Sequence, residues 1–196
     1  MNDRLSLLFG SLCALSAFVF SGCGASESPK AKVPGACTPP PLDLVLMTSK
    51  QINPTAQGEP RPVVLRLYQL KDDARLENAS FEAIWQNDKT TLGDDLVRME
   101  EVQLYPDKTL NKRIERGVGV RHLAAVALFQ EPKGRSWVST FDLPSVCETT
   151  CAICDDDGHP LKSAGLSYYV TGATVDDGAD KLADFAPRTG SLLGSP

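Results

Sequence analysis

The alternation of apolar and polar residues in the middle of the chain most strongly limits what it can fold into. In residues 63–70 (VVLRLYQL), Leu65 and Leu67 alternate with Arg66 and Tyr68. A period of two places the apolar side chains on one face of a β-strand and the polar ones on the other. We therefore predict a strand at residues 63–70 with its apolar face directed toward a core.

Similar short patterns, separated by turn residues such as Pro106-Asp107, recur along the chain. The chain also has a short helical pattern after Ser80, in which Phe81, Ile84 and Trp85 lie at positions i, i+3 and i+4. Short strands with turn signals every 8–12 residues or so are typical of an all-β sandwich of two sheets, here with a small helical insertion. We expect Trp85 and Trp137 to fill the core or its margin. The other predicted strands are residues 42–47, 96–104, 109–116, 122–129, 136–143 and 166–171.

The N-terminal residues indicate export. Arg4 precedes an apolar run at residues 5–20, which is shorter than the about 20 residues that span a bilayer and fits a signal-peptide core. The sequence Phe20-Ser21-Gly22-Cys23 resembles a lipobox, so we predict that residues 1–22 are removed and that Cys23 is lipidated. The alternative is an ordinary signal peptide cut near Ala25, which would leave a soluble periplasmic protein.

Composition indicates the domain organisation and excludes one class of partner. Residues 23–41 are rich in Ser, Pro, Ala and Gly and are predicted to form a lipidated N-terminus and a flexible tether. We expect the folded domain at residues 42–172 and a disordered tail at residues 173–196. The formal net charge is −5 and no basic stripe is present, so we expect no nucleic-acid partner.

Four further cysteines belong to the predicted exported chain. Three of them lie in a Cys-rich insertion near residues 147–160, with His159 close behind, and such a set could bind zinc. Exported proteins more often use cysteines in disulfides, which we favour over a metal. Of the three possible pairings, one plausible arrangement joins the first cysteine to one of the other three and pairs the remaining two locally. The four disulfide candidates are Cys37, Cys147, Cys151 and Cys154.

The chain shows no signature of catalysis. His122 begins an apolar strand and has no Ser or Cys nucleophile motif near it. The acidic turn Asp155-Asp156-Asp157-Gly158 lacks the ligand spacing of a calcium loop. We therefore expect a protein that is not an enzyme and that has no cofactor and no metal.

The order of these segments resembles a known family. Asn53-Pro54 lies in a loop that ends at Arg61-Pro62 and is followed by the strand at residues 63–70. Downstream come Phe81 with Ile84-Trp85, then Leu92-Gly93-Asp94, and a strand that ends at Leu104-Tyr105-Pro106. Together these segments resemble the small outer-membrane lipoprotein of the type VI secretion membrane complex, the TssJ or VasD family.

The resemblance implies a fold, a location and a partner. Members of the family have a transthyretin-like β-sandwich and are not enzymes. They sit at the inner face of the outer membrane, lipid-anchored and facing the periplasm, and bind the periplasmic C-terminal region of the large inner-membrane TssM protein. The alternative for this chain is a periplasmic lipoprotein whose transthyretin-like sandwich binds a small molecule or a cell-wall component.

In the family, the loop between the first two strands contacts TssM. The matching segment here is residues 50–61 (KQINPTAQGEPR), a polar loop whose prolines limit the entropy lost on binding. For single residues the simpler interpretation, that they only shape a turn, is equally good. The expected partner-binding residues are Lys50, Gln51, Ile52, Asn53, Pro54, Gln57, Glu59 and Arg61.

Overall fold

The computed structural model describes residues 37–182 except 148–149, 156 and 162–164. The predicted signal peptide, Cys23, most of the predicted tether and residues 183–196 lie outside this range. No helix among the described residues is long and apolar enough to cross a membrane.

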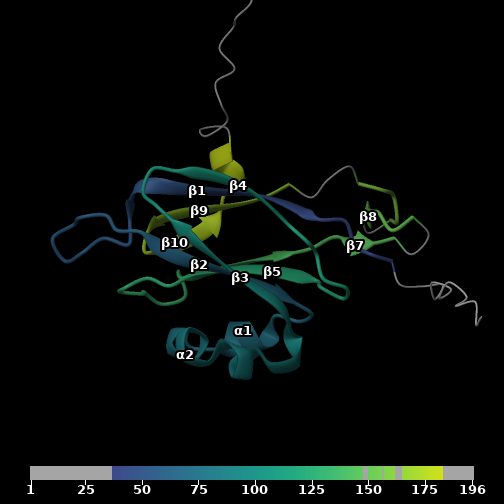
Figure 1. Cartoon of the computed structure of the whole chain (residues 1–196), viewed down its shortest axis with the longest axis horizontal. Coiled ribbons are helices and arrows are strands. Elements are labelled where there is room, and N and C mark those ends of the chain that lie inside the picture. The colour runs from purple at the N-terminus through teal and green to yellow at the C-terminus, as the bar shows by residue number, and fades with distance from the viewer. Residues whose placement is uncertain (1–36, 148–149, 156, 162–164, 183–196) are drawn as a thin grey trace, which may run out of the picture. The chain divides into compact units, whose positions relative to one another are not determined.

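Two four-stranded sheets pack face to face, as Figure 1 shows, and confirm the predicted β-sandwich. The strand order is β10-β9-β1-β4 in the first sheet and β3-β2-β5-β6 in the second, and β7 and β8 form a separate hairpin. The first sheet consists of β1 (Leu42–Ile52), β4 (Thr109–Ile114), β9 (Gly165–Gly172) and β10 (Thr174–Asp177). The second consists of β2 (Val63–Leu70), β3 (Leu96–Leu104), β5 (His122–Ala127) and β6 (Val138–Asp142). The hairpin consists of β7 (Ser145–Val146) and β8 (Ile153–Cys154).

Strand β1 is one of the two inner strands of the first sheet. It pairs antiparallel with β4 on one side and parallel with β9 on the other. Leu42, Leu44 and Leu46 are buried, whereas Asp43 and Val45, which lie between them, are only half-buried. This alternation is the pattern of a strand that turns one face to a core.

Strand β2 is buried on both faces, although the sequence indicated one polar face. Leu65 and Leu67 face the first sheet, whereas Tyr68 on the opposite face is also fully buried. The helices α1 (Ala74–Asn78) and α2 (Phe81–Leu92) lie over that second face (Figure 1). The Tyr68 hydroxyl donates a hydrogen bond of 2.9 Å to Asp88 of α2, and burial raises its pKa.

Arg66 fastens the helical insertion to the sheet. Its guanidinium donates to the backbone carbonyls of Ile84 and Trp85 at 3.2 and 3.3 Å and to a Glu101 carboxylate oxygen at 2.9 Å. Arg66 therefore holds α2 against the sheet. The face of β2 that the sequence predicted to be exposed to solvent is covered by this helix.

Two sequence-based expectations about the core and the tail are wrong. Trp137 is buried, at 1% exposure, but Trp85 is 54% exposed. Successive helical residues are separated by about 100°, so α2 buries Ile84 and turns Trp85 to solvent. Residues 174–177 form β10, which pairs with β9, followed by the short 3₁₀ helix η2 (Ala179–Lys181). The predicted disordered tail therefore does not begin at residue 173.

The two tryptophans give a matched test of this packing. Trp137 contacts the Phe81 ring edge to face, with centroids 5.5 Å apart, and its indole N–H donates to the Gly134 carbonyl. We expect Trp137→Ala to lower the free energy of unfolding by about 3–5 kcal/mol. Trp85→Ala should change it by about 0.5 kcal/mol or less. Urea unfolding curves would measure both, and equal effects would contradict the assigned burial.

Candidate functional site

The connection between β1 and β2, residues 53–62, projects from one end of the sandwich (Figure 1). Its base is closed by backbone hydrogen bonds. The Asn53 N–H donates to the Gly172 carbonyl at 2.6 Å, and the Arg61 N–H donates to the Ile52 carbonyl at 3.0 Å. We call residues 53–62 the projecting loop.

Asn53 anchors the projecting loop at its base. Its φ of +44° lies in the left-handed region, which Asn tolerates better than most residues. The side-chain amide donates to the Pro62 carbonyl at 3.1 Å, and its oxygen accepts the Gln130 backbone N–H at 2.9 Å. Asn53 therefore joins both ends of the loop and ties them to the segment after β5.

The tip of the loop is held by a hydrogen-bonded turn around Thr55. The Thr55 hydroxyl oxygen accepts the backbone N–H groups of Gln57 and Glu59, both at 3.2 Å. The Thr55 N–H donates to the Glu59 carbonyl at 2.9 Å, and Gly58 supplies the φ of +82° that the turn requires. An ordered loop loses less conformational entropy on binding than a flexible one.

The structure places the predicted partner-binding residues in two groups. Strand β1 continues to Ile52, so Lys50 and Gln51 are exposed strand residues and the loop begins at Asn53. Ile52 is fully buried in the core and is unavailable to a partner, which corrects that part of the prediction. The remaining residues belong to the projecting loop: Asn53 and Pro54 are half-buried, and Gln57, Glu59 and Arg61 are exposed.

Two neighbouring segments that sequence reasoning missed lie at the same end. In the turn between β3 and β4, Tyr105 is 53% exposed, and its carbonyl accepts a hydrogen bond of 2.7 Å from the buried Thr48 hydroxyl. In the segment after β5, Gln130 contacts Asn53 as described above, and Arg61 approaches its side chain at 3.5 Å. The sequence signal for the β3–β4 turn was its aromatic residue, Tyr105, directly before Pro106-Asp107. The segment after β5 depends on tertiary contacts that no local pattern reveals.

Two disulfides lie at the opposite end of β1. Cys37 is bonded to Cys151, and Cys147 is bonded to Cys154. This pairing joins the residue that enters the sandwich to the β7–β8 hairpin and closes the hairpin on itself. The first bridge spans 114 residues, and closing so long a loop stabilises a fold by about 5 kcal/mol in the chain-entropy estimate. With the sulfur atoms paired, the zinc set with His159 does not form. The His159 imidazole instead lies 3.5 Å from the Asp155 carboxylate.

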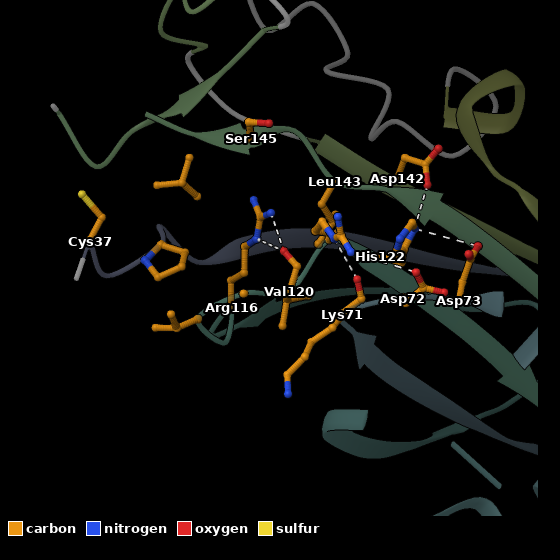
Figure 2. Close-up of a pocket in the computed structure, with 15 residues that line it drawn as sticks. Cys37, Lys71, Asp72, Asp73, Arg116, Val120, His122, Asp142, Leu143 and Ser145 are labelled. Atoms are coloured by element: carbon orange, nitrogen blue, oxygen red, sulfur yellow. Dashed lines mark hydrogen bonds and ion pairs between the residues drawn. The ribbon is translucent and has the colours of Figure 1, made fainter. Parts of the chain in front are cut away.

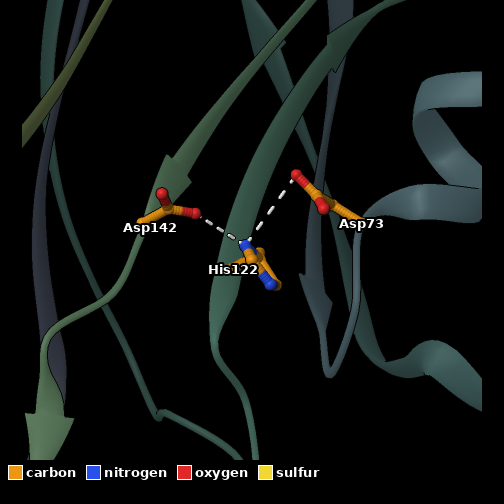
Figure 3. Close-up of side chains that lie close together, drawn as sticks. All are labelled: Asp73, His122 and Asp142. Carbon is orange, nitrogen blue, oxygen red and sulfur yellow. Dashed lines mark hydrogen bonds and ion pairs between the residues drawn. The ribbon is translucent and has the colours of Figure 1, made fainter.

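A pocket of about 910 Å³ opens at this disulfide end (Figure 2). Its wall is formed by Cys37, by the start of the helical insertion, by the β4–β5 turn and by the chain between β6 and β7. At one side of the pocket His122 lies between two carboxylates (Figure 3). Its Nδ1 is 2.8 Å from Asp142 and 3.8 Å from Asp73.

The arrangement around His122 has the donor types of a metal site, since the three ligand atoms lie within 4.8 Å of one another. Hydrogen bonding already accounts for it. His122 and Asp142 are cross-strand partners of β5 and β6, and Asp73 lies directly before α1. The imidazole therefore ties the start of the helical insertion to the end of β6.

Comparison with known proteins identifies relatives of this chain. Residues 40–154 match the profile of a family described as type VI secretion lipoprotein, with the member names VasD, EvfM and TssJ. Among solved structures, the type VI secretion lipoprotein TssJ1 from Pseudomonas aeruginosa is 25% identical with a TM-score of 0.57, and the match covers 70% of this chain and 94% of that one. A comparison with curated proteins found no match.

Two further structures are similar in fold. Lip from Serratia marcescens, described as a membrane bound component of the Type VI Secretion System, is 22% identical with a TM-score of 0.59. That match covers 70% of this chain and 96% of that one. A chain in a structure named for the type VI secretion protein TssM C-terminal domain (869-1107) from EAEC is 22% identical with a TM-score of 0.54, again covering 70% and 96%.

The anchoring of the projecting loop by Asn53 can be tested directly. Asn53→Ala removes the contacts to Pro62 and Gln130 and leaves a strained left-handed residue. We expect it to destabilise the loop locally by about 1–3 kcal/mol. Hydrogen exchange at the Gln130 amide should speed up accordingly, whereas the amides of β5 should exchange at an unchanged rate. Unchanged protection of the Gln130 amide would show that Asn53 is not the anchor.

Proposed function

The chain belongs to the family of type VI secretion lipoproteins, and from this premise we propose that its projecting loop anchors the inner-membrane TssM protein. In this proposal Cys23 carries the lipid, the outer membrane holds that lipid, and the sandwich faces the periplasm. The loop binds the periplasmic C-terminal region of TssM. The family is a structural part of the secretion membrane complex, so the role assigned to this chain is mechanical and not catalytic.

The observation that carries the proposal is the position and order of the projecting loop. It lies at the end of β1 remote from Cys37, through which the tether enters the sandwich. Its exposed tip is internally hydrogen-bonded around Thr55. A partner that approaches from the side away from the membrane anchor would meet this surface first.

Two neighbouring segments support a wider proposed surface than the predicted loop alone. Tyr105 lies in a turn held to β1 through Thr48, and Gln130 is held by Asn53. Aromatic residues are enriched among the residues that dominate binding energy at protein interfaces. We therefore include Tyr105 and the exposed residues after β5 with Lys50, Gln51 and the projecting loop in the proposed TssM-binding surface.

One of the similar structures is named for a TssM C-terminal domain, and this supports TssM as the proposed partner. That fact concerns the structure so named. We extend TssM binding to this chain because the chain shares the fold and the family. The following experiment tests that binding on this chain alone.

The loop tip is the part to replace. A variant with residues 55–60 replaced by a Gly-Ser segment of equal length keeps the Asn53 and Arg61 contacts at the base. We expect its affinity for the TssM periplasmic C-terminal region to fall at least about tenfold, because ordered contacts are lost and the loop must be immobilised on binding. Bio-layer interferometry with the full-length lipoprotein in detergent would measure this.

Trp85→Ala is the matched control, since it removes a large exposed side chain from α2, far from the loop in the sequence. It should bind TssM as the unchanged protein does, and both variants should unfold at the same urea concentration. Unchanged affinity after loop replacement would overturn the loop assignment.

The anchor is tested separately. A chain in which residues 1–22 are exchanged for the signal peptide of a soluble periplasmic protein and Cys23→Ser is introduced cannot be acylated. We expect it to leave the membrane fraction, to bind TssM with unchanged affinity and to fail to support secretion. Cys13→Ser within the natural leader is the control and should behave normally. Normal secretion by the unacylated chain would show that the lipid is dispensable.

A further inference from the structure

Arg116, just after β4, is an unusual arginine because it is buried without a counter-ion among the residues that the structure describes. The residue is only 6% exposed. Its guanidinium donates from Nε and Nη2 to the Val120 carbonyl, at 3.3 and 2.7 Å, and from Nη1 to the Pro144 carbonyl at 2.8 Å. All of these acceptors are neutral.

Within the described residues, Arg116 therefore meets only neutral acceptors. No carboxylate of the described residues forms an ion pair with Arg116, and burial alone lowers its pKa. A guanidinium has five N–H donors, and the three hydrogen bonds above leave one donor on Nη1 and one on Nη2 without a partner among the described residues. Two such donors are the groups that bind a carboxylate in the bidentate arrangement.

Arg116 lines the pocket at the disulfide end, and the pocket separates its charges (Figure 2). Arg116 lies in the part of the wall next to Val120, to whose carbonyl it donates. Asp73 and Asp142, which contact His122, lie in another part together with Asp72, and Val120 and Leu143 lie between them and Arg116 (Figure 2). Asp142 is the most accessible of the three, with its side chain 89% exposed.

Arg121, the basic residue paired with Asp72, does not cancel this separation. The Arg121 guanidinium contacts Asp72 at 4.0 Å and donates to the Lys71 carbonyl at 2.9 Å, and it is largely exposed. An exposed pair of this kind contributes little. The pocket thus offers a buried cation at one position and accessible carboxylates at another.

We infer that this pocket binds a short peptide by its C-terminal carboxylate, which pairs with Arg116, while its free amino group faces the aspartates around His122. A short peptide carries both charges at its two ends. The volume of about 910 Å³ is within the range of small-molecule sites, roughly 300–1,000 Å³, and exceeds what a single amino acid fills. The inference does not depend on the TssM-binding surface, which lies at the other end of β1.

Three matched ligands test it on the full-length lipoprotein in neutral detergent. Trialanine carries both charges, trialaninamide lacks the carboxylate, and N-acetyl-trialanine lacks the ammonium group. In a titration followed by NMR, we expect saturable shifts of the Val120 amide and the Arg116 side-chain resonances with trialanine. Affinity should fall at least about tenfold for trialaninamide, the size expected for a lost hydrogen bond between charged groups, and less for N-acetyl-trialanine.

Two variants separate the roles of the pocket residues. Arg116→Lys keeps the charge but removes the bidentate donors, so trialanine affinity should fall and the discrimination against trialaninamide should shrink. Asp142→Asn should remove the preference for trialanine over N-acetyl-trialanine. Arg113→Gln is the control, because that arginine lies on β4, three residues before Arg116, but pairs with Asp43 outside the pocket, and the variant should bind all three ligands normally.

Some outcomes would overturn the inference without reference to any variant. Equal binding of trialanine and trialaninamide by the unchanged protein would exclude recognition of the carboxylate. Binding of glycerophosphoethanolamine without binding of trialanine would replace the peptide with a phospholipid headgroup. Absence of saturable shifts with all ligands would leave Arg116 with a purely structural role.

Discussion

The parallel pairing of β1 with β9 is the constraint on which the rest of the structure depends. Parallel neighbours require a crossover connection, and here the whole second sheet lies between them in the sequence. Strand β9, the parallel partner of β1, therefore lies near the end of the described chain. Since β1 is 11 residues long, about 35 Å at the usual rise, it also separates the disulfide end from the projecting loop.

Much of the fold could be predicted because the strands of the sandwich obey a period of two. Leu65 and Leu67 do face the core, as their alternation with polar residues indicated. Arg66 and Tyr68 gave a misleading signal, because a polar face that is covered by a helix has the same sequence pattern as one exposed to water. Only the partners, Asp88 and the carbonyls of α2, reveal the difference.

Other elements escaped prediction because tertiary contacts define them. Strand β10 is short, and its Val175 N–H donates to the Ser136 carbonyl outside its own sheet. Helix α1 is five residues long, too short to show a clear helical period. The spacing of Trp85 from Phe81 predicts a shared buried face, but α2 buries only a narrow stripe that includes Ile84 and Leu92.

The candidate site was predictable in part. The family resemblance pointed to residues 50–61, but it did not distinguish Ile52, whose side chain belongs to the core. Nor did it reveal that Gln130 supports the loop from another strand connection. Arg116 had no sequence signal at all. An arginine at the end of a strand is ordinarily a surface residue, and its burial appears only when Val120 and Pro144 close around it.

The direction of β1 has a consequence for how the protein withstands tension. A pull between Cys37 and the projecting loop runs along the strand, so the hydrogen bonds to β4 and β9 are loaded in shear and must yield together. The same bonds loaded from one end across the strand would open one after another. The bridge from Cys37 to Cys151 passes part of that load to the β7–β8 hairpin, which its own disulfide closes, so the pull enters the sandwich at two points of the same end.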